Sequence, residues 1–166
     1  MTHTTLMDTR PVARNTAWPA DETELLTRAD ALLAEGRPRE ALALLPRTDS
    51  PWVRNARGVC LLRLGRPHEA IEALRDLVFD HTGFAIRSDA DPVFQANYAT
   101  ALLLDGNAEG FWSVLGGIGD RTHPAVARLD DAVRRWKAGM TLGQRIASAL
   151  GIGGPRFALD FPPGDL

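Results

Sequence analysis

The chain has 166 residues, of which 45% are hydrophobic and 24% are charged, and its net charge is -2. This composition is typical of one globular domain or one compact repeat array, and it argues against a disordered, collagen-like or membrane-spanning chain. Ala and Leu are abundant whereas Tyr occurs once, which favours helices over strands. The slightly acidic balance gives no indication of general affinity for nucleic acids.

The single cysteine, Cys60, excludes an internal disulfide and a zinc finger, so a reducing cytoplasm is the expected location. No segment approaches the ~18 uninterrupted apolar residues of a membrane helix. Residues 1–18 are rich in Thr, Arg and small residues without a hydrophobic period, and they contain no apolar core of a signal peptide. We expect a flexible N-terminal leader over 1–20.

Residues 21–46 predict a pair of helices joined by a tight turn. Asp21 and Glu24 have the spacing of a helix N-terminus, where a carboxylate oxygen accepts from amides of the first turn. Behind them apolar residues recur on one helical face until Gly36 ends the helix. Pro38 begins the second helix, since proline at the first helical position loses no hydrogen bond.

The same pattern of proline, apolar helix and glycine recurs along the chain. Three more long helices are predicted, each with a proline at its start and a glycine at its end: Pro51 to Gly65, Pro92 to Gly106 and Pro124 to Gly139. Shorter second helices follow from Pro67, from Asn107 and from the capping box of Thr141 and Gln144 up to Leu150. The expected domain, residues 21–151, thus contains four helical hairpins.

The glycines between paired helices are spaced about 34 residues apart on average, which is the period of a helix-turn-helix repeat. Seven residues before these glycines stand small residues, as close packing of paired helices requires: Ala29, Gly58, Ala99 and Ala132. In these positions, and above all in PWVRNARGVCLLRLGRPHEAIEALRDLVFD (51–80), the chain resembles the tetratricopeptide repeat family. The first hairpin matches through AEGRPREALALL, whereas the third departs where Phe111 replaces a small residue.

This resemblance covers about residues 21–120, and extends to 151 by period. It implies an all-α fold, a right-handed superhelix or solenoid of about four hairpins, whose concave face binds peptides. The interval from Gly65 to Gly106 is long for the repeat because it contains an insertion at about 81–90. A non-repeat bundle of helices would give many of the same signals and stays open as an alternative.

Two groups of residues invite a catalytic interpretation. His81, Asp89 and Asp91 lie in or beside the inserted loop and suggest a metal site, but Asp91 precedes a proline and is better explained as a helix cap. Cys60 followed by His68 suggests a nucleophile and a base, but Cys60 lies among apolar residues and is expected to be buried and inert. We therefore expect no catalytic residue, no metal and no other cofactor.

The first helix of each hairpin would line the concave face. Residues 36–67 carry a net charge of +5 and 68–120 carry -7, and the arginines of the first group suit carboxylate or phosphate partners, although attraction between neighbouring repeats explains them too. The face is otherwise mainly apolar, with Trp52 as its anchor. The predicted partner-binding residues are Trp52, Asn55, Arg54, Arg57, Leu62, Arg63 and Asn97.

The C-terminal segment, 152–166, is expected to be an extended tail. Phe157, Leu159 and Phe161 alternate with other residues in RFALDFPPGDL, and this period of two fits an extended strand-like segment with one buried side. We hypothesise that the tail folds back along the repeat array or covers its last hairpin, because terminal repeats need a cap. A docking or export peptide is the rival interpretation.

Together these patterns predict a non-catalytic adaptor that binds a protein or peptide partner through an apolar, Arg-flanked concave face, with its own tail as one candidate occupant. Two alternatives stay open: a small metal-dependent hydrolytic enzyme that uses the 81–91 loop, and a structural subunit of a homo-oligomer. Nucleic acid and membrane are not expected partners, and the sequence leaves open whether the groove is free or filled.

Overall fold

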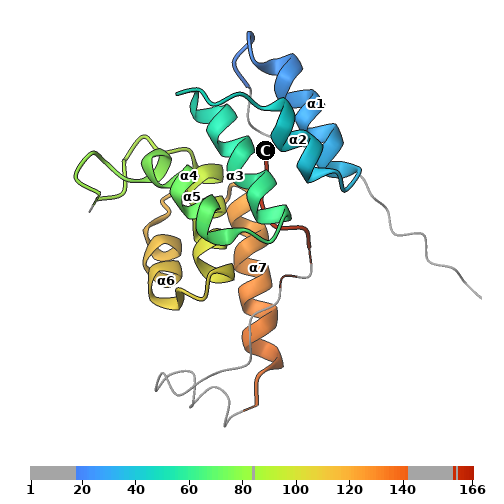
Figure 1. The fold of residues 1–166 in the computed structure, drawn as a ribbon. Coiled ribbons are helices and arrows are strands. Elements are labelled where there is room, and N and C mark those ends of the chain that lie inside the picture. Colours follow the sequence, from blue (N-terminus) through green and yellow to red (C-terminus); the bar gives the residue numbers. More distant parts are fainter. Residues whose placement is uncertain (1–17, 84, 142–158, 160) are drawn as a thin grey trace, which may run out of the picture.

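The computed structural model describes residues 18–83, 85–141, 159 and 161–166, and in these residues the fold is all-helical (Figure 1). This part of the chain contains seven helices and no strand. They are α1 (Thr23–Ala34), α2 (Pro38–Leu44), α3 (Pro51–Arg63), α4 (Pro67–Val78), α5 (Pro92–Leu104), α6 (Ala108–Gly117) and α7 (Pro124–Gly139). The predicted all-α class is confirmed for these residues.

Prolines and polar side chains begin most of the helices, as the sequence predicts. Proline is the first residue of α2, α3, α4, α5 and α7. The Ser50 hydroxyl accepts from the amide of Val53 at 3.4 Å, and the Asp91 carboxylate accepts from the amide of Val93 at 2.9 Å. The helix cap predicted at Asp91 is thus confirmed.

The first helix of each of three hairpins ends in the same way. Gly36, Gly65 and Gly106 follow α1, α3 and α5 with φ of 72°, 69° and 84°, in the left-handed region that favours glycine. In each case the glycine amide and the next amide donate to carbonyls of the last turn, as when Arg66 donates to Leu61 at 3.0 Å. This Schellman motif reverses the chain and sends the following helix back along its predecessor.

Two helix ends differ in detail from the prediction. Glu22, and not Asp21, occupies the N-cap position of α1, because a turn precedes the helix. α7 ends at Gly139 as predicted, but this glycine has no left-handed φ and so does not form the turn seen after α1, α3 and α5. The predicted last helix, ending at Leu150, and most of the predicted leader lie outside the described residues.

Neighbouring helices pack in a regular order. Each helix from α1 to α5 packs against the next one, and α1 also packs on α3, α3 on α5, and α5 on α7. Small residues permit this contact: a Cβ atom at Gly58 would lie 2.6 Å from Cγ of Leu74 on α4. Ala29 and Ala99 are 0% exposed, as their predicted place at helix crossings requires.

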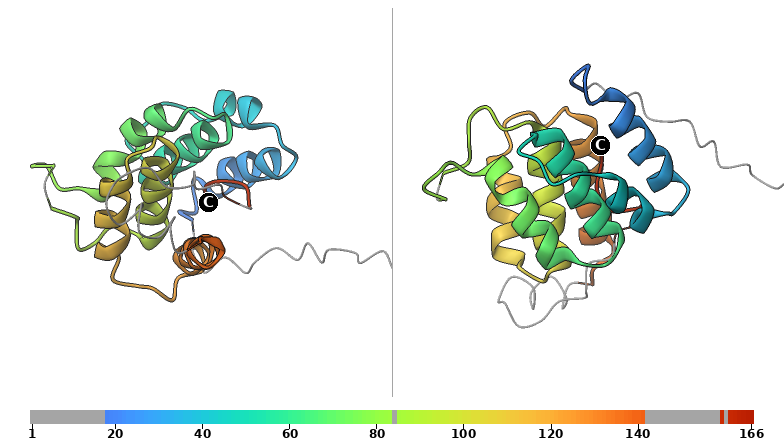
Figure 2. Two further views of the ribbon diagram at one scale, coloured as in Figure 1. Left: turned by 90° about the horizontal axis from the view of Figure 1, so that it is seen from below. Right: turned by 45° about the horizontal axis from the view of Figure 1, so that its top comes forward.

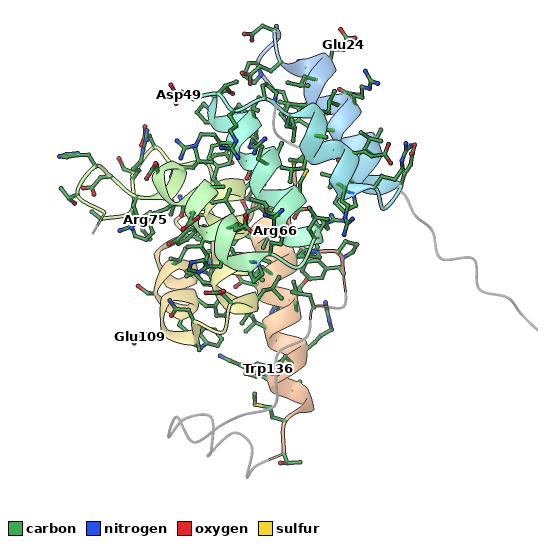
Figure 3. The ribbon with its side chains drawn as sticks, viewed as in Figure 1. Glu24, Asp49, Arg66, Arg75, Glu109 and Trp136 are labelled. Carbon is green, nitrogen blue, oxygen red and sulfur yellow. The ribbon has the colours of Figure 1, made fainter. Side chains whose placement is uncertain are left out.

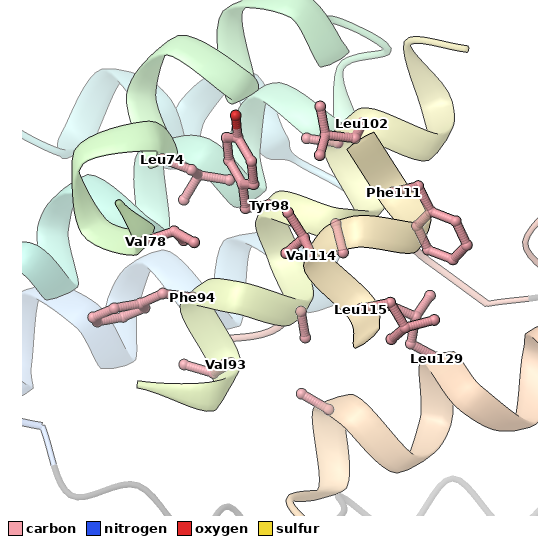
Figure 4. Packing of buried hydrophobic residues seen from close by; sticks show 14 of the residues in the cluster. Leu74, Val78, Val93, Phe94, Tyr98, Leu102, Phe111, Val114, Leu115 and Leu129 are labelled. Carbon is pink, nitrogen blue, oxygen red and sulfur yellow. The ribbon is translucent and has the colours of Figure 1, made fainter. Parts of the chain in front are cut away.

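Buried apolar side chains form two clusters. One spans α3 to α7 and includes Leu74, Phe111 and Leu129 (Figure 4). The other joins α1, α2 and α3, and Trp52 contacts both. Charged side chains such as Glu24 and Glu109 lie on the outside of the helices (Figure 3). Among the described helices, none has the length and apolar character that crossing a membrane demands.

The inserted segment between α4 and α5 is pinned to the helices. Phe79 and Ile86 form an isolated antiparallel bridge, and the amide of Arg87 donates to the carbonyl of Val78 at 2.8 Å. Ile86 packs against the larger core cluster.

Candidate functional site

The last residues of the chain lie against the odd-numbered helices. We call residues 161–166 the tail segment, and Figure 2 shows the C-terminal end between α7 and the N-terminal helices. Leu166 is only 7% exposed and belongs to the apolar cluster of α1, α2 and α3, together with Leu26 and Val59. The tail segment is therefore seated on the fold by a buried apolar side chain.

Two buried asparagines hold the backbone of the tail segment. Asn55 on α3 is 0% exposed and Asn97 on α5 is 1% exposed. Both side-chain amides donate to the carbonyl of Asp165, at 3.2 Å from Asn55 and 2.7 Å from Asn97. The Asp165 amide donates back to Oδ1 of Asn97 at 2.9 Å. Asn97 thus pairs with both backbone groups of one residue, much as a neighbouring strand would.

The two asparagines also support each other. Nδ2 of Asn97 donates to Oδ1 of Asn55 at 2.8 Å, across the contact between α3 and α5. Buried polar groups are costly unless hydrogen-bonded, and here the tail segment supplies partners for both amides. The other buried polar side chains of α5, Gln95 and Thr100, donate to carbonyls of their own segment, at Ala90 and Ala96, whereas the asparagine pair bonds to the backbone of the tail segment.

Arg63, the last residue of α3, binds the backbone carbonyls of the two residues that precede Asp165. Its Nε donates to the carbonyl of Pro163 at 2.5 Å and its Nη2 donates to that of Gly164 at 3.0 Å. Burial lowers the pKa of the Arg63 guanidinium from its ordinary value, although the nearby Asp165 carboxylate raises it. An arginine stays charged under such a shift, so it offers charge-assisted hydrogen bonds to the tail segment.

Gly164 lies close against α3, where a side chain would be crowded. Its φ is +84°, and a Cβ atom there would lie 3.0 Å from Cγ1 of Val59 and 3.3 Å from Cδ1 of Leu62. Both the conformation and the close approach to α3 therefore require glycine.

Helix α7 contributes the basic partner of the acidic residue in the tail segment. Nη2 of Arg128 pairs with Oδ1 of Asp165 at 2.9 Å, and the same guanidinium lies 5.6 Å from the centroid of the Phe161 ring. We call the surface formed by α1, α3, α5 and α7 under the tail segment the inner face. Its contact residues are Asn55, Val59, Leu62, Arg63, Asn97 and Arg128.

Four of the seven predicted partner-binding residues lie on the inner face: Asn55, Leu62, Arg63 and Asn97. The other three make contacts elsewhere. The Trp52 ring meets that of Phe94 edge-on with centroids 4.8 Å apart. Arg54 donates to Asp76 at 3.0 Å, and Arg57 donates to the carbonyl of Leu45 at 2.7 Å. These two arginines join α3 to α4 and to the end of α2.

Arg128 was missing from the predicted set. It lies on α7, in the hairpin that resembles the repeat least, and no local pattern around it indicates a site. The acidic residue Asp165 in the sequence of the tail could have suggested that a basic residue faces it. Of the predicted tail residues, Leu159 is partly buried against the larger cluster and Phe161 lies near Arg128, whereas Phe157 lies outside the described residues.

The inserted loop was the alternative site, for a metal-dependent enzyme, and its aspartates make local hydrogen bonds and ion pairs instead. Arg87 donates to Asp89 at 2.8 Å and holds the pKa of that carboxyl below its usual value. The Thr82 hydroxyl and three backbone hydrogen bonds, with Thr82, Gly83 and Ala85, likewise lower the pKa of Asp80, and His81 is exposed. Across the described residues no group of three or more His, Cys, Asp and Glu is placed to hold a metal ion.

Cys60 and His68 do not form a catalytic pair. Cys60 is 0% exposed, and burial raises the pKa of its thiol to about 12, against a smaller opposite effect of Arg57 and Arg63. A thiol with such a pKa is protonated near neutral pH and is a poor nucleophile. His68 is exposed on α4, with Nδ1 3.7 Å from Asp105.

Comparison with known proteins gives no relative for this site. No family model matches the chain, and neither a curated protein nor a solved structure matches it.

Proposed function

We propose that this protein is a non-catalytic interaction module of tetratricopeptide-like hairpins, whose inner face binds an extended peptide segment of a partner protein. In this proposal the tail segment is a built-in occupant, and a partner binds by displacing it. The hairpins would stack as a right-handed superhelix. Three features support that arrangement: the repeated Schellman turns, the packing of each odd helix on the next odd one, and the average glycine spacing of about 34 residues.

The observation that carries the proposal is the pairing of Asn97 with both backbone groups of Asp165. Contacts to backbone amides and carbonyls are available on any extended peptide, whatever its side chains. Because Asn97 and Asn55 lie on packed helices, their geometry is fixed before binding, which reduces the ordering cost of association.

Paired baits test the proposal. We would immobilise the full chain, the variant Leu166→Asp, and the double variant Leu166→Asp/Asn97→Ala, and compare the proteins that each captures. Leu166→Asp places a charge in an apolar site and should release the tail segment, so it should recover a partner more strongly than the unmodified chain. The double variant should lose that partner.

Arg66→Ala is the matched control for nonspecific effects of surface changes. Arg66 is exposed at the start of α4, and its guanidinium pairs with Glu69 of the same helix (Figure 3). It should leave the capture unchanged. Recovery of the same proteins in the same amounts by all four baits would refute the proposed function.

A further inference from the structure

The contacts of the tail segment define what else the inner face accepts. We infer that the inner face selects partner segments with the pattern glycine, acidic residue, aliphatic residue, in which the backbone is extended around the acidic position. This inference rests on the proposed function and specifies its ligand: a protein segment that carries the chemistry of Gly164, Asp165 and Leu166.

The backbone contacts set the register of such a ligand. Arg63 takes the carbonyls of Pro163 and Gly164, and the asparagine pair takes both backbone groups of Asp165. These donors and acceptors sit on α3 and α5 at fixed positions, so a bound chain cannot slide by one residue without losing several hydrogen bonds at once. Each side chain of the ligand therefore meets one particular part of the inner face.

The first position of the pattern accepts only glycine. A Cβ atom there would lie 3.0 Å from Val59 and 3.3 Å from Leu62, so these side chains would have to shift, and the positive φ disfavours every other residue. Since both neighbours lie in the packed core of α3 and are at most 2% exposed, they cannot move aside cheaply. A partner segment that carries a side chain at this position is therefore excluded from the inner face.

The second and third positions are selected by charge and by burial. Arg128 pairs with the carboxylate of Asp165, and Arg63 adds positive charge beside it, so an acidic residue fits and a lysine is repelled. Leu166 enters the apolar cluster of α1 to α3, which excludes a polar residue there.

A peptide binding experiment tests this pattern on the full-length protein. The receptor is the variant Gly164→Val, in which the tail segment cannot take its place, and the probe is a fluorescein-labelled peptide with the sequence LDFPPGDL, measured by fluorescence anisotropy. An attached tail competes at an effective concentration on the order of a millimolar. The peptide should therefore bind at least about tenfold more tightly to Gly164→Val than to the unmodified chain.

Altered peptides test each position. Replacing the peptide's glycine by valine, or its acidic residue next to the last leucine by lysine, should weaken binding to the Gly164→Val receptor at least about tenfold. The receptor Gly164→Val/Arg128→Glu should reverse the second preference and bind the lysine peptide more tightly than the parent peptide. Gly164→Val/Arg66→Glu, changed at an arginine outside the inner face, should keep the original order. A merely structural role of Arg128 would not produce this exchange of preference.

The outcomes separate this inference from the proposed function. Equal binding of the three peptides, or no binding of the parent peptide to a receptor whose helical circular dichroism is unchanged, overturns the inference. Leu166→Asp is a second released receptor that must give the same order. If the bait experiment recovers a partner through Asn97 but these peptides are not distinguished, the inner face binds peptides without this pattern and only the inference fails.

Discussion

Truncation of Asn97 to alanine measures how strongly the asparagine pair holds the tail segment. The substitution removes hydrogen bonds to the Asp165 carbonyl at 2.7 Å, to the Asp165 amide at 2.9 Å and to Oδ1 of Asn55 at 2.8 Å. At about 1 kcal/mol net for each bond, the free energy of unfolding should fall by about 3 kcal/mol. Urea unfolding followed by circular dichroism gives this value.

Making the same substitution in Leu166→Asp, where the tail segment is released, isolates the part of the stability loss that comes from contacts with the tail segment. In Leu166→Asp only the bond between Asn97 and Asn55 remains to be lost, so Asn97→Ala should cost about 1 kcal/mol there, and the coupling between the two changes should be about 2 kcal/mol. Thr100→Val is the matched control. Its hydroxyl donates to the Ala96 carbonyl at 2.8 Å within α5, so its cost should be equal in both backgrounds. Equal costs of Asn97→Ala in both backgrounds would refute the argument.

Four further predictions concern the helices and the core. Gly58→Ala should lower the thermal midpoint, because its Cβ atom would lie 2.6 Å from Leu74 Cγ and overpacking costs about 1–3 kcal/mol. Gly116→Ala, which has no atom within 4 Å of the new Cβ, should instead stabilise α6 by up to about 1 kcal/mol. Identical shifts of the thermal midpoint in the two variants would contradict the packing argument. Asp91→Ala removes the cap of α5 and should cost about 1 kcal/mol in urea unfolding, and Asp91→Asn, which keeps an acceptor, should recover most of it. Because burial raises the pKa of Cys60 to about 12, iodoacetamide at pH 8 should alkylate the folded protein at least about a hundredfold more slowly than the urea-unfolded protein. Since the pKa of this thiol is higher in the folded state, its contribution to stability should be present at neutral pH and lost as the pH rises towards 12, and Cys60→Ala should lack that loss.

The sequence by itself determined where most helices begin and end. Proline fixes φ and lacks an amide, and glycine adopts left-handed φ without strain, so Pro51, Gly65 and Pro67 mark a helix, its end and the next helix through strictly local effects. Gly58 was likewise recognisable as a crossing point from its repeat position. Gly139 also marks the end of α7, although it has no left-handed φ.

Charge and residue type in the sequence indicated an interaction surface but did not separate its members. Arg54, Arg57 and Arg63 belong to one arginine-rich segment, yet each points to a different neighbour of α3: Asp76 of α4, the Leu45 carbonyl after α2, and the tail segment. A helix turns 100° per residue, so similar residues on one helix face different directions. Their roles follow from what each side of α3 packs against.

Only the tertiary structure decided that the tail segment meets the asparagine pair. Asp165 is 110 residues from Asn55 and 68 from Asn97, and Asn55 stands ten residues before Gly65 whereas Asn97 stands nine before Gly106, so the repeat period does not place them as equivalents. Local backbone preferences act over a few residues and specify the helices. Which polar groups become buried together is set by the packing of all the odd helices at once, and their hydrogen bonds must then be satisfied by whatever segment lies there.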